Sequence, residues 1–390
     1  MRNDSGGSLA NLRQSNRRAI VDALAAYGAL SRADVSRRTG ISRTTVSSLV
    51  AELVREGSVL EDRQRPRQPG TGRPPILLHL AVSSDPVIAV DMGHRHIRLA
   101  VAERDANVLA ERTVGLNVDY SPHRALDTAA ELVHELLAET GIALADIAGV
   151  GVGVPGPVDW RTGTTSSAVL PGWRGLAPAA ELERRIGVAV QVDNDAFLGA
   201  LGEHRYGAAR GFDDVIYVKV ADGLGAGLVL GGRLHRGSTG IAGEIGHVQV
   251  NENGPVCRCG SRGCLESQAS VPKLIELLQP AHGETLGAET VLALADDGDA
   301  GVNRVLNDAG RAIGRVLADL CNTLNPSAVV VGGIMGSAPA LVDGVRHAVD
   351  RYAQPDAAAA VRVTQSALGE RAELTGAIAL ATSTARTISP

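Results

Sequence analysis

The first 80 residues contain three stretches in which apolar side chains recur at helical spacing. Residues 16–26 place such side chains on one face of a helix, and Gly28 follows where that helix would end. Ser31 and Asp34 have the spacing of a capping box, which predicts the start of a short second helix. A third helix is predicted over residues 42–57. Its buried stripe would consist of Val46, Leu49, Val50 and Leu53.

Two short apolar runs, Ser58–Leu60 and Ile76–Leu80, flank a segment rich in Arg, Pro and Gly, which predicts a β-hairpin wing. The polar face of the third helix offers small hydrogen-bonding groups and one Arg, as a recognition helix does in a major groove. We therefore predict a winged helix-turn-helix over residues 1–80; the alternative is a three-helix bundle with a solvated basic loop. The predicted DNA contacts are Ser42, Arg43, Thr44, Thr45, Ser47, Arg65, Arg67 and Arg73.

From residue 85 onward, short apolar strands end in glycine turns. Val87–Val90 leads into Asp91-Met-Gly93, and about 130 residues later the run 214–221 leads into a second turn at Asp222-Gly223. In both places another strand leaves the turn and helical segments follow. This duplication predicts two α/β lobes with a cleft between them, where the turns could hold phosphate with backbone N–H groups. Taken alone, each turn fits a tight hairpin equally well.

A further strand, residues 188–192, ends in the polar run Asp193-Asn194-Asp195 at a predicted helix start. Asn194 can both donate to and accept from a hydroxyl group, and Asp195 could act as a base toward one. The alternative is simple capping of the helix by Asp193 or Asn194. A cap accounts for one such residue and leaves the other two for a cleft.

Composition and charge narrow the class of protein. Of the 390 residues, 44% are apolar, and no apolar run approaches the roughly 20 residues that a membrane span requires. We expect a cytoplasmic, nucleoid-associated protein of bacterial type without a membrane partner. Residues 1–80 carry 13 Arg, no Lys and 7 acidic residues, a net charge of +6, whereas the remainder carries −11. A basic N-terminal region followed by an acidic remainder indicates that the N-terminal region binds a polyanion.

Three of the four cysteines lie within eight residues of one another, at Cys257, Cys259 and Cys264, and His247 precedes them. Three thiols and an imidazole are the ligand set of a closed tetrahedral zinc site. Such a site leaves no open position for water, which argues against a zinc hydrolase. The interleaved Glu244, His247 and Glu266 would form a polar recognition surface supported by the metal.

With these segments in place, the chain resembles the ROK family, named for repressors, open reading frames and kinases. The resemblance implies two α/β lobes of the actin and hexokinase type over residues 81–390, around a sugar cleft, with the zinc motif at residues 247–264. Members with a winged helix at the N-terminus are sugar-responsive transcription regulators. The motifs that carry the resemblance are Asp91-Met-Gly93, GVPGPVD at 153–159, DNDA at 193–196, EIGH at 244–247 and C-x-C-G-x-x-G-C-x-E at 257–266.

The resemblance also implies roles for individual residues. In the family's sugar kinases the Asp that matches Asp195 is the catalytic base. His247 would bind zinc through one ring nitrogen and sugar through the other. Carried over, the sugar-binding residues are Asn194, Asp195, Glu244, His247 and Glu266. The zinc ligands are His247, Cys257, Cys259 and Cys264.

Both phosphate turns depart from the family's kinases. His94 and Arg95 replace the second Gly and the Thr of D-x-G-G-T, and Ala221-Asp222-Gly223 replaces G-T-G. A side chain at His94 prevents close approach of the backbone to a phosphate. A carboxylate at Asp222 would repel a phosphate by about 1 kcal/mol per unit charge at 4 Å in water. We therefore predict a sugar sensor and no enzyme activity.

The leading hypothesis is a repressor, a homodimer or homotetramer, that binds a palindromic operator in double-stranded DNA. A sugar or sugar derivative would be its effector, and each chain would hold one structural Zn²⁺. The alternative is an active ATP-dependent sugar kinase with Asp195 as its base and an accessory DNA-binding head.

Overall fold

The computed structural model describes residues 5–56, 58–62, 76–80, 85–165 and 169–384. The chain divides into two compact units, Met1–Ser83 and Ser84–Pro390, which we call the head and the body. Within the described residues, no helix combines the length and the apolar character needed to cross a membrane.

The head consists of three helices and a three-stranded antiparallel sheet in the order β1-β3-β2. Its core is formed by apolar residues of all three helices together with Val59 and Leu78 of the sheet. The predicted capping box is present, because the Ser31 side chain accepts from the Asp34 N–H and the Asp34 side chain accepts from the Ser31 N–H. The elements are α1 (Ser5–Tyr27), β1 (Leu30–Ser31), α2 (Arg32–Thr39), α3 (Arg43–Arg55), β2 (Val59–Asp62) and β3 (Leu77–Leu80).

The first helix begins at Ser5, earlier than the apolar pattern predicts. Its N-terminal part carries basic side chains that pair with acidic residues of α3. Arg13 pairs with Glu52, and Arg17 Nη1 donates to Glu56 Oε1 at 2.9 Å. Arg13 lies before residue 16, where the apolar pattern begins, so its pairing with Glu52 supports a part of α1 that apolar periodicity does not identify.

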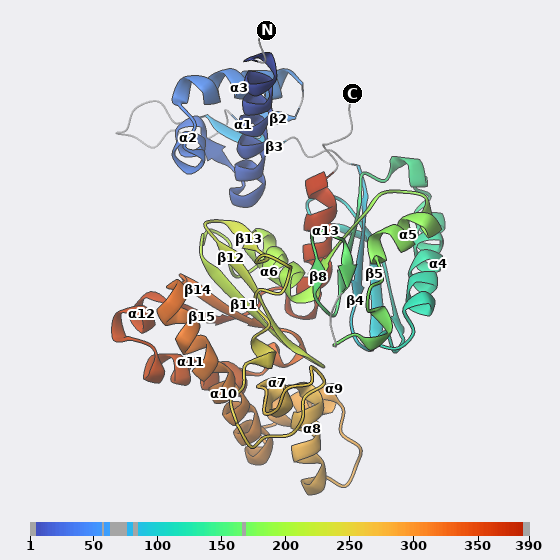
Figure 1. The fold of residues 1–390 in the computed structure, drawn as a ribbon, viewed down its shortest axis with the longest axis vertical. Coiled ribbons are helices and arrows are strands. Elements are labelled where there is room, and N and C mark those ends of the chain that lie inside the picture. Colours follow the sequence, from blue (N-terminus) through green and yellow to red (C-terminus); the bar gives the residue numbers. More distant parts are fainter. Residues whose placement is uncertain (1–4, 57, 63–75, 81–84, 166–168, 385–390) are drawn as a thin grey trace. The chain divides into compact units, whose positions relative to one another are not determined.

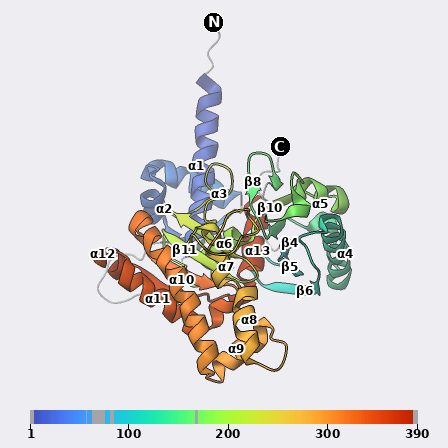
Figure 2. The same cartoon turned by 60° about the horizontal axis from the view of Figure 1, so that its bottom comes forward.

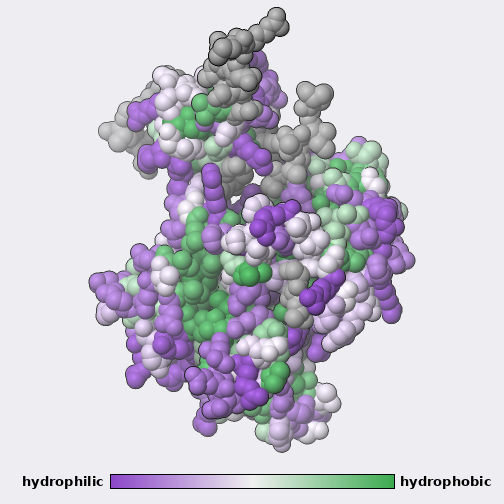
Figure 3. Space-filling view, viewed as in Figure 1, coloured by the Kyte–Doolittle hydropathy of each residue, from purple (hydrophilic) through white to green (hydrophobic). Residues whose placement is uncertain are grey.

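The first lobe of the body is a five-stranded sheet in the order β10-β7-β4-β5-β6. The helices α4 and α5 pack their apolar sides on one face of it. The outward side of α4 is hydrophilic, as expected for a helix with one buried stripe (Figure 3). The elements are β4 (Val87–Met92), β5 (His96–Ala102), β6 (Val108–Gly115), α4 (Pro122–Thr140), β7 (Val150–Val154), β8 (Val158–Asp159), β9 (Thr164–Thr165), α5 (Pro178–Ile186) and β10 (Val190–Asn194).

The second lobe repeats this plan with a sheet in the order β13-β12-β11-β14-β15. The long helices α10 and α11 lie side by side against one of its faces (Figure 2). The elements are β11 (Val215–Val220), β12 (Leu224–Leu230), β13 (Arg233–His235), α7 (Glu266–Ala269), α8 (Val271–Leu278), α9 (Ala288–Asp296), α10 (Ala300–Leu324), β14 (Ala328–Gly332), α11 (Pro339–Tyr352), α12 (Pro355–Ala360) and β15 (Arg362–Gln365).

Two helices, α6 (Asp195–Tyr206) and α13 (Ala372–Thr384), join the lobes (Figure 1). Apolar residues of both helices contact strands of the first sheet and of the second. The helices touch at glycines, because a Cβ at Gly202 would lie 2.4 Å from the Ala372 carbonyl oxygen and one at Gly376 would lie 1.8 Å from that of Leu198. The predicted duplication is present: β4–β5 and β11–β12 are antiparallel hairpins, each beside a parallel strand, β7 or β14.

Candidate functional site

A cavity of about 360 Å³ lies between the two lobes of the body. The turns between β4 and β5 and between β11 and β12 line it, together with the start of α6. The family resemblance assigned five residues to sugar binding, and all five line this one cavity. They are Asn194, Asp195, Glu244, His247 and Glu266.

The polar residues at the start of α6, Asp193, Asn194 and Asp195, have different roles. Asn194 is the N-cap, since its Oδ1 accepts from the Phe197 N–H at 3.2 Å. Asp193 lies behind the cavity and pairs with Arg236 at 2.6 Å. The capping alternative therefore holds for Asn194, whose amide nitrogen is still available to a ligand.

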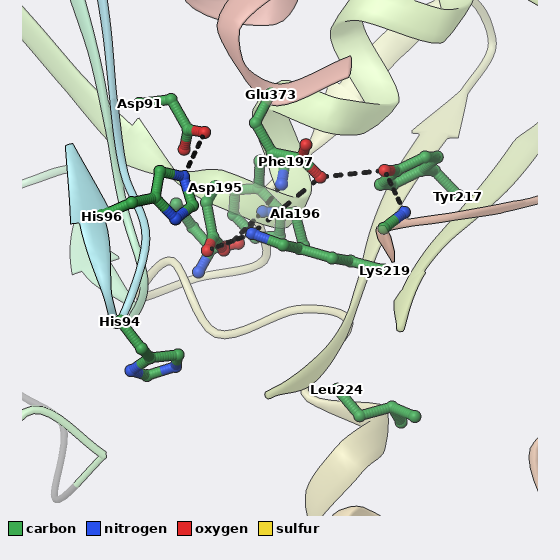
Figure 4. A network of polar contacts seen from close by, with 12 residues as sticks. Asp91, His94, His96, Asp195, Ala196, Phe197, Tyr217, Lys219, Leu224 and Glu373 are labelled. Atoms are coloured by element: carbon green, nitrogen blue, oxygen red, sulfur yellow. Dashed lines mark hydrogen bonds and ion pairs between the residues drawn. The ribbon is translucent and has the colours of Figure 1, made fainter. Parts of the chain in front are cut away.

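Asp195 is paired with a half-buried lysine that the sequence interpretation overlooked. Lys219 Nζ lies 2.8 Å from Asp195 Oδ2 and 4.0 Å from Glu373 Oε1 (Figure 4). Burial alone would lower the pKa of Lys219, but the charges of Asp195, Glu373 and Asp91 outweigh it and raise the pKa. A lysine in the middle of the apolar strand β11 was the available signal, and it is one of only two lysines in the chain.

Glu373 completes this network from α13. Tyr217 donates a hydrogen bond to Glu373 Oε1 at 2.9 Å and accepts one from the Gly333 N–H at 3.2 Å (Figure 4). Burial raises the pKa of Glu373 to about 7, although Lys219 acts in the opposite direction. Near pH 7 the Glu373 carboxyl group is therefore divided between its neutral and its charged form.

A second internal pair holds the carboxylate of the first turn. His96 Nε2 lies 3.1 Å from Asp91 Oδ2 (Figure 4). Burial would raise the pKa of Asp91, but the hydrogen bond from His96 and the charges of His96 and Lys219 lower it. Among the described residues, nothing donates to the buried Asp91 Oδ1.

The departures from the kinase turns also have partners. Arg95 lies 3.4 Å from Asp222, so a residue of the first turn neutralises the carboxylate of the second. His94 Nδ1 lies 2.6 Å from Asp119, and its Nε2 would be 3.2 Å from a Cβ at Gly223. Side chains of the protein itself therefore face one another across the space between the two turns.

Two glutamates of the second lobe face the cavity beside His247. Glu266 Oε2 accepts from the Leu224 N–H at 3.0 Å, which fixes one carboxylate oxygen. Burial, followed by the charges of Asp195 and Glu266, raises the pKa of Glu244 to about 7. Near neutral pH, Glu244 can thus either donate to or accept from a hydroxyl group.

The ligand atoms of His247, Cys257, Cys259 and Cys264 all lie within 4.8 Å of one another. Cys259 Sγ is 3.7 Å from Cys264 Sγ, and Cys257 Sγ is 3.6 Å from His247 Nδ1. Bonds of about 2.3 Å at tetrahedral angles would separate two sulfur ligands by roughly 3.8 Å. The residues therefore fit a tetrahedral metal ion, with His247 Nε2 left facing Glu244 at 3.6 Å.

On the head, the predicted DNA-contacting residues of α3 lie at its N-terminal end. Ser42 is the N-cap, and its hydroxyl accepts from the Thr45 N–H at 3.2 Å. Arg43, Thr44 and Ser47 are exposed, whereas Thr45 is half-buried. The wing residues Arg65, Arg67 and Arg73 lie outside the described residues.

Comparison with known proteins matches the ROK family over residues 87–384 and a winged helix-turn-helix DNA-binding domain over residues 13–59. The chain belongs to the ROK family. It is 30% identical over 394 residues to a putative xylose repressor of Caldicellulosiruptor sp., covering 96% of this chain and 97% of the relative. It is also 33% identical to a glucokinase of Streptomyces coelicolor, covering 75% of this chain and 96% of the relative.

The fold of this ROK protein also recurs in a solved ROK family transcriptional regulator, a homologue of the Escherichia coli MLC protein. That structure matches with a TM-score of 0.76 at 23% identity and covers 96% of this chain and 97% of its own. The glucokinase matches only the body, whereas the xylose repressor and the regulator extend over head and body together.

Proposed function

We propose that this ROK protein is a transcriptional repressor that binds operator DNA through its head and senses a sugar in the cavity of its body. One observation carries the proposal: the Asp that would be the kinase base is paired with Lys219 at 2.8 Å. Taking a proton from a hydroxyl would neutralise Asp195 and leave the half-buried ammonium group of Lys219 without its nearest counter-charge. The head and the full-length similarity to a named xylose repressor support the same function.

The effector would be a sugar or a sugar derivative bound by Asn194, Asp195, Glu244, His247 and Glu266. The names of the relatives make D-xylose and D-glucose the first candidates. Carboxylates and an amide around a cavity of about 360 Å³ suit a ligand with several hydroxyl groups.

The metal would be Zn²⁺, held by His247 Nδ1 and the three thiolates. Zinc would fix the loop of residues 257–264 and orient His247 so that its Nε2 faces the cavity. It would serve as a structural ion, because the protein supplies all four ligands of a tetrahedral site.

The repressor would act at the bacterial nucleoid as a homodimer or homotetramer. A winged helix-turn-helix reads one half-site, and two heads related by two-fold symmetry would read a palindromic operator. Sugar binding would shift the population between two arrangements of the protein that differ in operator affinity.

The test combines three measurements on the purified full-length chain. Calorimetry with D-xylose, D-glucose and a wider sugar panel should give saturable binding without ATP. Fluorescence anisotropy should show operator binding that changes when a bound sugar is added. A coupled assay with ATP and the same sugars should give no turnover.

The competing function is an active sugar kinase, which the 33% identity to a glucokinase favours. ATP-dependent phosphorylation of a sugar that disappears in Asp195→Asn would establish that function and refute ours. If the sugars bound only when ATP was present, that result would also favour a kinase.

A further inference from the structure

We propose that Arg258 is a positioning residue that transmits metal binding to the sugar cavity and to the first lobe. This inference rests on the proposed function, because it concerns the same sugar site. Arg258 lies between two candidate metal ligands, Cys257 and Cys259, and does not itself line the cavity.

The side chain of Arg258 lies between two carboxylates. Its Nε is 3.5 Å from Glu266 Oε1, and its Nη1 is 3.7 Å from Asp119 Oδ2. Glu266 lines the cavity and uses its other oxygen to accept from the Leu224 N–H. Arg258 therefore contacts the remaining carboxylate oxygen of Glu266, a proposed sugar-binding residue, without lining the cavity itself.

Asp119 brings the first lobe into this arrangement. It lies between β6 and α4, and its other carboxylate oxygen is 2.6 Å from His94 Nδ1 of the first turn. His94 is one of the two residues that replace the kinase turn. The contacts His94–Asp119–Arg258–Glu266 thus connect the altered phosphate turn of the first lobe to a proposed sugar-binding residue of the second lobe.

The metal would determine where Arg258 points. Its two neighbours are ligands, and backbone bonds close the loop around it, from Cys257 N–H to the Ser261 carbonyl at 2.8 Å and from Gly260 N–H to the Cys257 carbonyl at 3.0 Å. A metal bound to both flanking thiolates would fix the Arg258 backbone on either side. Without the metal, the guanidinium would lose its fixed position between the two lobes.

Arg258 is 37% exposed and its ion pairs exceed 3.4 Å, so solvent screens them and the expected effect is modest. In the full-length, zinc-loaded protein, Arg258→Gln should weaken binding of D-xylose or D-glucose roughly two- to fivefold in calorimetry. Arg262→Gln removes the same charge from the same loop, at an exposed residue, and should leave the affinity unchanged. Zinc content by mass spectrometry should equal one per chain in both variants.

A double-mutant cycle tests the link to the first lobe. Asp119→Asn alone should weaken sugar binding. The double variant with Arg258→Gln should lose less affinity for sugar than the product of the two single losses. Independent, multiplicative effects would overturn the bridge between the lobes. Unchanged sugar affinity in Arg258→Gln would overturn the positioning role itself.

Hydrogen exchange provides a readout that requires no sugar. The Val118 N–H donates to the His94 carbonyl at 3.0 Å, next to Asp119. Exchange in residues 116–121 should accelerate when zinc is chelated from the wild-type protein, and it should already be faster in zinc-loaded Arg258→Gln. If chelation changes this segment equally in both proteins, Arg258 does not transmit the metal's effect.

The two readouts separate this inference from the proposed function. A wild-type protein that binds neither sugar but shows the expected exchange pattern would refute the assigned effectors and keep Arg258 as the link between metal and lobe. A wild-type protein that binds sugar while both Arg258 readouts stay unchanged would refute the inference alone.

Discussion

At the scale of single residues, Lys219 interacts with several carboxylates of the cleft. Its ammonium group lies among three buried carboxylates, those of Asp91, Asp195 and Glu373. Removing one partner from a buried ionic network is strongly destabilising because the remaining charges stay desolvated.

Lys219→Met should therefore lower the free energy of unfolding at pH 7 by about 3 kcal/mol or more, measured by urea denaturation. The deficit should shrink at acid pH, where the carboxylates can take up protons. Lys273→Met is the matched control, because the side chain of Lys273 in α8 is 39% exposed and pairs with Glu276, whereas that of Lys219 is 13% exposed. Equal stability of the two variants would contradict the buried network.

Glu373 gives the stability a defined pH dependence. The folded protein keeps this carboxyl group protonated up to about pH 7, whereas the unfolded chain releases the proton near 4.5. Between these values the folded state binds more protons, so the free energy of unfolding falls as pH rises and then levels off. Glu373→Gln cannot ionise and should lack this decline, which is on the order of 2 kcal/mol. Parallel pH profiles of the two proteins would contradict the assignment.

Asn194 has two tasks that substitution can separate. Asn194→Ala removes the cap of α6, at a cost of about 1 kcal/mol, together with the amide that faces the cavity. Asn194→Asp keeps a capping oxygen, but it replaces the amide donor by a carboxylate oxygen next to Asp193 and Asp195. Both variants should lose sugar binding in calorimetry and retain operator binding without sugar, and only the Ala variant should lose the contribution of the cap to stability. Sugar binding that survives in Asn194→Asp would move the binding site elsewhere.

At the scale of elements, α3 directs its N-terminal end outward. Arg43 is exposed in its first turn, next to the Ser42 cap, as base recognition requires. Arg43→Ala should weaken operator binding by about 1–3 kcal/mol in anisotropy titrations at fixed salt. Arg55→Ala removes the same charge from the other end of the helix and should have a smaller effect. Equal effects of both variants would indicate charge attraction alone.

The zinc loop is the second element whose role can be tested. Cys259→Ser should lose bound zinc, measured by mass spectrometry, and the operator response to sugar should be lost with it. Cys321→Ala provides a cysteine control outside the loop, since Cys321 is buried in α10 away from the cluster. A sugar response that persists without the metal would separate zinc from sensing.

Local patterns were sufficient to predict most elements, whereas the five sugar-binding residues that line the cavity came from the family resemblance. Period-3.6 and glycine-turn signals lie within short segments, and the cysteine spacing by itself predicts three metal ligands. The start of α1 was missed because contacts before residue 16, such as the pair Arg13–Glu52, leave no apolar period.

The partners inside the cleft could not be predicted from local pattern. Lys219 meets Glu373 from a helix 154 residues later, and Arg258 meets Asp119 from the other lobe. Such pairs follow from how strands and helices from distant parts of the chain are brought together. The carboxylate of Asp222 was expected only to repel phosphate, and its pairing with Arg95 depends on the second turn lying opposite the first.

At the scale of the whole molecule, one architecture serves relatives named as repressors and as kinases. Because one fold can serve several functions, the function of this chain depends on its head and on the side chains in its cleft. In this chain the cleft contains Lys219, His96 and Arg95, each opposite a carboxylate.

A cation supplied by the chain cannot be depleted by starvation or removed by a competing chelator. Occupancy of a cleft neutralised by Lys219 should therefore follow sugar concentration alone, whatever the cell's supply of ATP and magnesium. The sugar would leave chemically unchanged, so the signal would reverse as soon as the concentration falls. Gene expression controlled in this way would follow the equilibrium occupancy of the cleft by sugar, and the response would consume no ATP.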